Sequence, residues 1–128
     1  MSNKLEQYKI LLVEDNRSDM LLSQAVVMDV FPHCQTFPVT SVQEAYDLLQ
    51  EVNFNLVVLD LNLPDGHGPQ TVQQVRSFNR NVPIVVLTGS EREITVNQAL
   101  KLGADHVCLK SQLLNGDFRN ILEEKIRR

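Results

Sequence analysis

Five polar side chains stand directly after short apolar runs of this sequence, where buried strands would end. Glu14 and Asp15 follow KILLV, Asp60 follows NLVVL, Thr88 follows PIVVL, and Lys110 follows HVCL. A carboxylate at the edge of a core is costly unless it is paired or binds an ion. If these runs are neighbouring strands, three carboxylates, one hydroxyl and one ammonium converge on a single hollow.

Three carboxylates held close together form a site of hard oxygen ligands. Glu14, Asp15 and Asp60 would raise one another's pKa unless a cation intervenes. Mg²⁺ (or Mn²⁺) suits such a site, since Mg²⁺ binds one or two carboxylates, waters and a phosphoryl oxygen. A carboxylate beside the metal can act as a nucleophile and form an aspartyl-phosphate. Lys110 would then neutralise phosphoryl charge, and Thr88 would donate a hydrogen bond.

Strands and helices must alternate to position these groups. Short aliphatic runs separated by segments of helical period predict an α/β fold with a parallel sheet covered by helices on both faces. In such sheets, ligands bind beyond the carboxyl ends of the strands. Pro38 indicates that the second strand lies near a sheet edge. The predicted strands are 9–13, 34–39, 55–59, 83–87 and 106–109.

Local signals predict where helices and turns begin. Asn16, Ser41 and Ser90 each precede an acidic residue three places later, a spacing typical of helix N-termini. Asp65 and Gly66 indicate a turn after the third strand. The DLNLPDG segment lacks the acidic spacing of a calcium loop, which excludes that interpretation.

Composition limits the class of protein. The 128 residues favour one domain over residues 1–128, and a net charge of −4 argues against direct binding of nucleic acid. The sequence shows neither an apolar run of about 20 residues nor a secretory signal, which predicts a cytoplasmic protein without membrane contact. Cys34 and Cys108 are interpreted as reduced core thiols, and Met20 and Met28 as core packing.

Four motifs in order resemble the receiver domain of two-component response regulators: ILLVEDN at 10–16, VVLDLNLPDGHG at 57–68, PIVVLTGS at 83–90 and GADHVCLKS at 103–111. The resemblance covers nearly the whole chain. It implies a flavodoxin-like (βα)5 sandwich with a five-stranded parallel sheet in the order 2-1-3-4-5. It also implies phosphorylation of Asp60 by a histidine kinase or histidine phosphotransfer protein.

The resemblance also assigns a metal-binding role to each matching position. Glu14 and Asp15 correspond to the acidic pair, with Asp15 a direct metal ligand. Asp60 corresponds to the phosphoacceptor and second ligand, and Asn62 to the residue whose backbone carbonyl binds the metal. The expected cofactor is therefore Mg²⁺ or Mn²⁺, held by Glu14, Asp15, Asp60 and Asn62.

By the same resemblance, Thr88 and Lys110 grip the phosphoryl group and relay its arrival. The side chains of Asn62 and Ser90 flank the water that removes it. Output is expected through the face formed by residues 91–126, toward a downstream protein that the sequence does not name. The chain would be a self-phosphorylating switch with slow autodephosphorylation, carrying no output domain, and not an enzyme that turns over a metabolite.

Two positions depart from the family. Ser111 follows Lys110 where the family has a proline after a cis bond, and a cis bond before a non-proline residue costs about 2.5–4 kcal/mol. The bond is therefore either strained or trans. Val107 replaces the usual tyrosine or phenylalanine, so switching by an aromatic ring is not expected. Both departures motivate an alternative, a receiver-like interaction module that works independently of phosphorylation.

Two other functions fit the predicted fold less well. A phosphatase of the haloacid dehalogenase type would need an acid where Asn62 stands. A flavin site would need a phosphate-binding loop after the first strand, but EDNRSD is too acidic to hold a phosphate without a metal.

Overall fold

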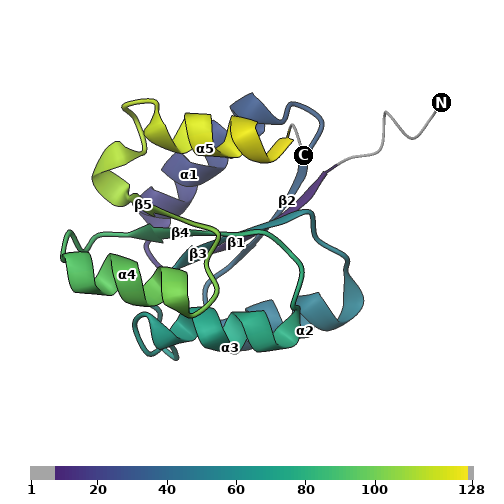
Figure 1. The fold of residues 1–128 in the computed structure, drawn as a ribbon. Coiled ribbons are helices and arrows are strands. Elements are labelled where there is room, and N and C mark those ends of the chain that lie inside the picture. Colours follow the sequence, from purple (N-terminus) through teal and green to yellow (C-terminus); the bar gives the residue numbers. More distant parts are fainter. Residues whose placement is uncertain (1–7, 127–128) are drawn as a thin grey trace.

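The computed structural model describes residues 8–126, and side chains over residues 8–124. A five-stranded parallel sheet forms its centre, with α1 and α5 on one face and α2, α3 and α4 on the other (Figure 1). The strand order is β2-β1-β3-β4-β5, which confirms the predicted topology. The elements are β1 Lys9–Val13, α1 Arg17–Val30, β2 Gln35–Val39, α2 Val42–Glu51, β3 Leu56–Asp60, α3 Gln70–Phe78, β4 Ile84–Thr88, α4 Glu93–Lys101, β5 His106–Leu109, the 3-10 turn η2 Lys110–Gln112 and α5 Asp117–Ile126.

Three strands begin one residue later than predicted, and two of them also end one residue later. β3 includes Asp60, which pairs with Leu87, and β4 includes Thr88, which pairs with Leu109. A parallel ladder uses backbone groups whatever the side chain, so it extends into the polar residue. Asp60 and Thr88 therefore belong to the last residue pairs of the sheet, each paired with the neighbouring strand on one side.

The sheet separates two hydrophobic cores. β3 and β4 are buried at all five positions, as strands covered on both faces should be. β2, which contains Pro38, lies at an edge of the sheet as predicted. The α1 and α5 side is closed by Met20, Val27, Phe118 and Leu122, and the other side by residues of α2, α3 and α4.

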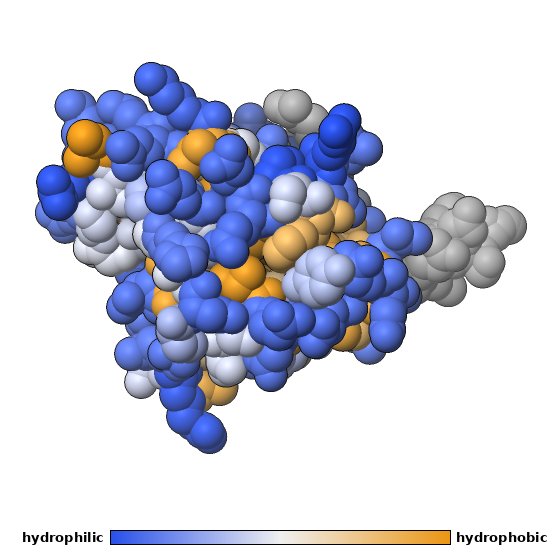
Figure 2. Space-filling view, turned by 90° about the horizontal axis from the view of Figure 1, so that it is seen from below, coloured by the Kyte–Doolittle hydropathy of each residue, from blue (hydrophilic) through white to orange (hydrophobic). Residues whose placement is uncertain are grey.

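The surface over α2, α3 and α4 is mostly hydrophilic, with separate hydrophobic patches (Figure 2). Tyr46, Ile94 and Leu100 are the large hydrophobic side chains of these helices that are exposed. Tyr46 still packs edge-on against Phe78, at 4.8 Å between ring centroids, which joins α2 to α3. Across residues 8–126, no helix is both long and apolar enough to span a membrane.

Two of the predicted helix starts are confirmed. The Asp19 amide donates to Asn16 Oδ1 at 2.9 Å, and the Glu44 amide donates to Ser41 Oγ at 3.1 Å. These bonds satisfy amides that the first helical turn leaves without partners. The Glu44 carboxylate instead accepts the Thr40 amide at 2.7 Å.

The predicted start at Ser90 is wrong, because α4 begins at Glu93 with Arg92 at the N-cap and no side-chain cap bond. The Ser90 amide donates to Thr88 Oγ1 at 3.1 Å, and its hydroxyl bonds to Thr95 Oγ1 at 3.3 Å. These bonds make Ser90 part of the loop that follows β4.

The interpretation of Met28 as a core residue is also wrong. Met28 is 52% exposed, whereas Met20 and Val27 are buried. Successive helical residues are rotated by about 100°, so the residue after Val27 turns outward. Both cysteines are free thiols, but only Cys108 is fully buried, and Cys34 is half-buried.

Asp65 provides a second cap for α2 from a distant part of the chain. Its Oδ1 accepts the Val42 amide at 2.8 Å, and its Oδ2 accepts the Gln43 amide at 3.0 Å. These bonds, chiefly that from Val42, hold the pKa of Asp65 below its ordinary value. The turn after β3, predicted from Asp65 and Gly66, is thereby tied to the start of α2.

We expect Asp65→Ala to lower the free energy of unfolding by about 0.5–1 kcal/mol, the lower part of the range for helix caps, because the site is exposed. A lowered carboxyl pKa stabilises the fold above the unfolded value near 3.8, and this contribution is lost as pH falls through the folded value. Urea unfolding at pH 7 and at pH 3 measures the difference in the free energy of unfolding between the wild type and Asp65→Ala, which should be smaller at pH 3. Asp47→Ala is the control. An equal difference at both pH values would contradict the cap.

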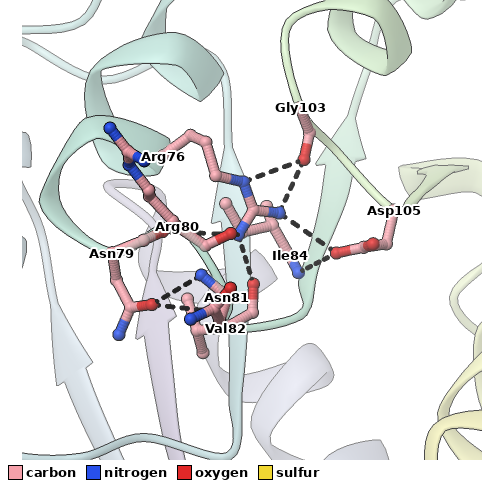
Figure 3. A network of polar contacts seen from close by, with 8 residues as sticks. All are labelled: Arg76, Asn79, Arg80, Asn81, Val82, Ile84, Gly103 and Asp105. Carbon is pink, nitrogen blue, oxygen red and sulfur yellow. Dashed lines mark hydrogen bonds and ion pairs between the residues drawn. The ribbon is translucent and has the colours of Figure 1, made fainter.

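Arg76 ties two loops together at the amino-terminal edge of the sheet (Figure 3). Its guanidinium donates to the Gly103 carbonyl at 2.6 Å, to the Val82 carbonyl at 2.6 Å and to Asp105 Oδ2 at 3.2 Å. Asp105 Oδ2 also accepts the Ile84 amide at 2.8 Å. Gly103 has φ of 124°, and a Cβ there would lie 3.2 Å from Arg76 side-chain atoms. This glycine allows both the turn and the approach of the arginine.

Candidate functional site

The carboxyl-terminal edge of the sheet opens into a cavity of about 600 Å³. Most of its wall is formed by the ends of β3 and β4, the loops that follow these two strands, and the start of η2. Five of the predicted site residues line it together: Asp60, Asn62, Thr88, Ser90 and Lys110. The cavity is also lined by Asp19, Gly66, Gly68, Gly89 and Thr95.

Lys110 lies at the centre of a cluster of acidic side chains. Its Nζ is 2.8 Å from Asp19 Oδ2, 3.1 Å from Glu14 Oε1 and 3.4 Å from Asp60 Oδ1. The side chains of Glu14 and Asp60 are only 4% and 3% exposed, and that of Lys110 is 18% exposed. Of the three carboxylates predicted to converge here, Glu14 and Asp60 lie beside Lys110, whereas the third carboxylate that contacts it is Asp19.

The cluster is strained electrostatically. Burial, followed by the neighbouring Asp60 carboxyl, raises the pKa of Glu14 to about 7, whereas the Asn16 amide and Lys110 act in the opposite direction. Burial opposes the charge on Lys110, but Asp19, Asp60 and Glu14 together raise its pKa above the ordinary value. One ammonium thus faces three carboxylates, and a further cation would relieve their repulsion.

The donor set fits a hard divalent cation. Glu14 and Asp60 present buried carboxylate oxygens, and Asn62 lies on the cavity wall beside them. Mg²⁺ and Mn²⁺ favour such ligands. Among the side chains that the structure describes, no group of three or more His, Cys, Asp or Glu is arranged to hold a metal ion, and Glu14 and Asp60 contact Lys110 instead.

The structure places Asp15 apart from this cavity. Asp15 is exposed and lines a separate hollow between α1 and β2, together with Glu14 and Met20. Its assignment as a direct metal ligand therefore stays a prediction that rests on the resemblance.

Asp19 is a member of the site that the sequence analysis missed. It was interpreted only as the acidic residue that follows the cap Asn16, yet its carboxylate bonds to Lys110, 91 positions later. One signal could have found it: Asp19 lies in the first turn of the helix that follows the strand end carrying Glu14. Its distance from Lys110, however, depends on how α1 packs beside β5 and η2.

Thr88 is buried at 4% exposure, and its hydroxyl oxygen accepts the Ser90 amide. The hydroxyl hydrogen is thus left for another acceptor, as the predicted phosphoryl contact requires. Asn62 is exposed at the cavity, and the Ser90 hydroxyl also bonds to Thr95.

The structure also shows the two positions that depart from the family pattern, Ser111 after Lys110 and Val107 on β5. All peptide bonds between the described residues are trans, including the bond from Lys110 to Ser111. The chain enters η2 at once, and Gln112 Oε1 accepts the Leu109 amide at 2.8 Å. Val107 is half-buried on β5 against the core that α2, α3 and α4 cover.

Comparison with known families gives a direct match. The model of the response regulator receiver domain matches residues 10–116. The range includes all the strand-end residues described above.

Individual relatives agree with this match. The swarming motility regulation protein RssB of Serratia marcescens is 34% identical over 102 residues, which cover 79% of this chain and 45% of RssB. The chain spans less than half the length of the curated relatives it matches.

Two solved structures are similar over most of their length. The phosphorylated cyanobacterial phytochrome response regulator RcpA is 26% identical, with a TM-score of 0.76 over 93% of this chain and 91% of RcpA. The Mn²⁺-bound response regulator Rcp1 is 28% identical, with a TM-score of 0.75 over 91% of this chain and 90% of Rcp1.

Proposed function

Because the chain belongs to the response regulator receiver domain family, we propose that it is a phospho-aspartate switch with Asp60 as the phosphoacceptor. One observation carries the proposal. Asp60 is a buried carboxylate at the end of a central strand, it lines the cavity, and the Lys110 ammonium lies 3.4 Å from its Oδ1.

The phosphoryl donor would be the phosphohistidine of a histidine kinase or histidine phosphotransfer protein. A carboxylate oxygen of Asp60 bonds to phosphorus as the phosphorus–nitrogen bond breaks, and the imidazole leaves with the electron pair. Lys110 neutralises charge on the phosphoryl oxygens, and the Thr88 hydroxyl donates to one of them. Water later bonds to phosphorus as the bond between phosphorus and the Asp60 oxygen breaks, so that the carboxylate leaves with the electron pair and inorganic phosphate is released.

A divalent cation completes the proposed site. Glu14, Asp15, Asp60 and the Asn62 carbonyl would hold Mg²⁺ or Mn²⁺, which supplies neutralising charge for the transfer when bound. The acidic donor set and the Mn²⁺ in the similar Rcp1 structure support this assignment.

The switch acts on other proteins and not on a metabolite. A downstream protein would bind the face formed by residues 91–126, where Ile94, Leu100 and Leu114 are exposed hydrophobic side chains. Such a partner distinguishes the two states only through contacts that differ between them.

Intact-mass spectrometry after incubation with Mg²⁺ and acetyl phosphate tests the proposal. We expect one phosphoryl adduct on the wild type, none on Asp60→Asn, and an unchanged adduct on the control Asp65→Asn, which neutralises an exposed acid of the next loop. An adduct that persists in Asp60→Asn would reject Asp60 as the acceptor. If the wild type shows no adduct with acetyl phosphate or with a phosphohistidine donor, the switch function is rejected.

The alternative is an interaction module that binds its partner regardless of phosphorylation. Val107 favours it, because a half-buried valine has no ring to move between two positions. Equal partner affinity for the phosphorylated and unphosphorylated chain would support this alternative.

A further inference from the structure

The shortest contact of Lys110 in the acidic cluster is not with the proposed phosphoacceptor. Its Nζ lies 2.8 Å from Asp19 Oδ2 but 3.4 Å from Asp60 Oδ1. The first distance is that of a charge-assisted hydrogen bond, whereas the second is that of a looser ion pair. The ammonium is therefore held mainly by α1 and by Glu14.

The local structure of α1 leaves the Asp19 carboxylate available for this contact. Asn16 caps the helix by accepting the Asp19 amide, so the helix start does not depend on the carboxylate of Asp19. The side chain of Asp19 is 28% exposed and lines the same cavity as Asp60. It thus lies where it can compete with Asp60 for one ammonium.

We propose that Asp19 is a positioning residue, which holds the Lys110 ammonium toward α1 in the unphosphorylated protein. The inference rests on the proposed phosphorylation of Asp60. A phosphoryl group on Asp60 brings more negative charge to the cavity and draws the ammonium away from Asp19. A phosphoryl group on Asp60 therefore weakens the contact between Lys110 and Asp19 of α1, and this contact in turn disfavours phosphorylation.

This competition connects the phosphoryl site to the first turn of α1 without the aromatic side chain that position 107 lacks. When Lys110 moves toward the phosphoryl group, the Asp19 carboxylate loses its partner and becomes more exposed to solvent. The start of α1 is therefore a segment whose contacts differ between the two states, as a switch requires.

A double-mutant cycle without phosphoryl donor or metal tests the contact itself. Asp19→Asn, Lys110→Met and the double variant are compared with the wild type by urea unfolding at pH 7.5. Removing an acid near Glu14 and Asp60 relieves repulsion, so the single variant does not isolate the pair, whereas the cycle does. Asp19→Asn changes the unfolding equilibrium constant by one factor when Lys110 is present and by another in the Lys110→Met background. We expect these two factors to differ about fivefold, as is typical of a part-buried ion pair.

The control for the cycle is Asp29→Asn, which removes a carboxylate from the same helix, where it pairs with Arg119 outside the site. Its effect should be the same with and without Lys110. A coupling between Asp19 and Lys110 no larger than that of Asp29 would overturn the proposal.

Binding of beryllofluoride, which mimics a phosphoryl group, tests the competition. With Mg²⁺ present, we expect Asp19→Asn to bind it about 3- to 10-fold more tightly than the wild type, a gain equal to the lost competing contact. Unchanged or weaker binding would overturn the positioning role, because the carboxylate would then not compete for the ammonium. Failure of the wild type to bind beryllofluoride would instead reject the proposed function, and the cycle would still decide whether the contact forms.

Discussion

Lys110→Met is expected to reduce the rate of Asp60 phosphorylation by about 10²–10³-fold, because a positioned charge that meets developing negative charge contributes that much to transfer reactions. The ammonium lies within 3.4 Å of Glu14, Asp19 and Asp60. Its removal leaves the phosphoryl group without this neutralising partner. The time course of adduct formation, followed by intact mass, measures the effect.

The same substitution should change stability in a pH-dependent manner. Without Lys110, buried Glu14 and Asp60 lose a neutralising charge, and we expect a loss of about 2–3 kcal/mol in the free energy of unfolding at pH 8. The folded pKa of Glu14 is about 7, against an ordinary 4.5, and Lys110 is one of the groups that lower it. A raised carboxyl pKa stabilises the fold below the unfolded value, and this contribution is lost as pH rises through the folded value. The loss should therefore be smaller at pH 5 than at pH 8.

Lys101→Met is the matched control, since Lys101 is an exposed lysine of the last turn of α4. It should leave the adduct and the pH dependence of stability unchanged. If the two lysine variants behave alike at pH 8, the acidic cluster does not depend on Lys110. If only the adduct is lost, the role of Lys110 is catalytic without a structural part.

Arg76→Met is expected to lower the free energy of unfolding by about 2–4 kcal/mol, because one planar guanidinium satisfies several backbone carbonyls and Asp105 together. The bonds to Gly103, Val82 and Asp105 close the loops before β4 and β5 (Figure 3). Urea unfolding measures the loss. The nearby exposed Arg80→Met is the control and should cost less than about 0.5 kcal/mol.

A phosphorylation assay distinguishes the structural role of Arg76 from a role in the transfer of the phosphoryl group. Arg76 lies at the amino-terminal edge of the sheet, whereas Asp60 and Lys110 lie at the carboxyl-terminal edge. Folded Arg76→Met should thus still acquire one phosphoryl group. Arg76→Lys should recover little of the stability, since a single ammonium cannot span the same set of acceptors. Recovery by lysine would show that charge alone matters there.

The sequence alone determined the strand-end chemistry. Asp60, Thr88 and Lys110 each follow an aliphatic run, and parallel strands present their carboxyl ends at one edge. Period and position therefore sufficed to predict that these side chains share a cavity. The same local reasoning predicted the helix start at Asn16, because a cap depends on residues within one turn.

Tertiary structure decided the contacts between distant segments. Asp19 reaches Lys110, Asp65 caps α2, and Arg76 joins Gly103 to Val82, and each pair is brought together only when the helices pack on the sheet. Asp19 and Asp65 both looked like local features, a helix-start acid and a turn residue. A carboxylate bonds to whatever donor packing places within about 3 Å, and sequence spacing does not encode that distance.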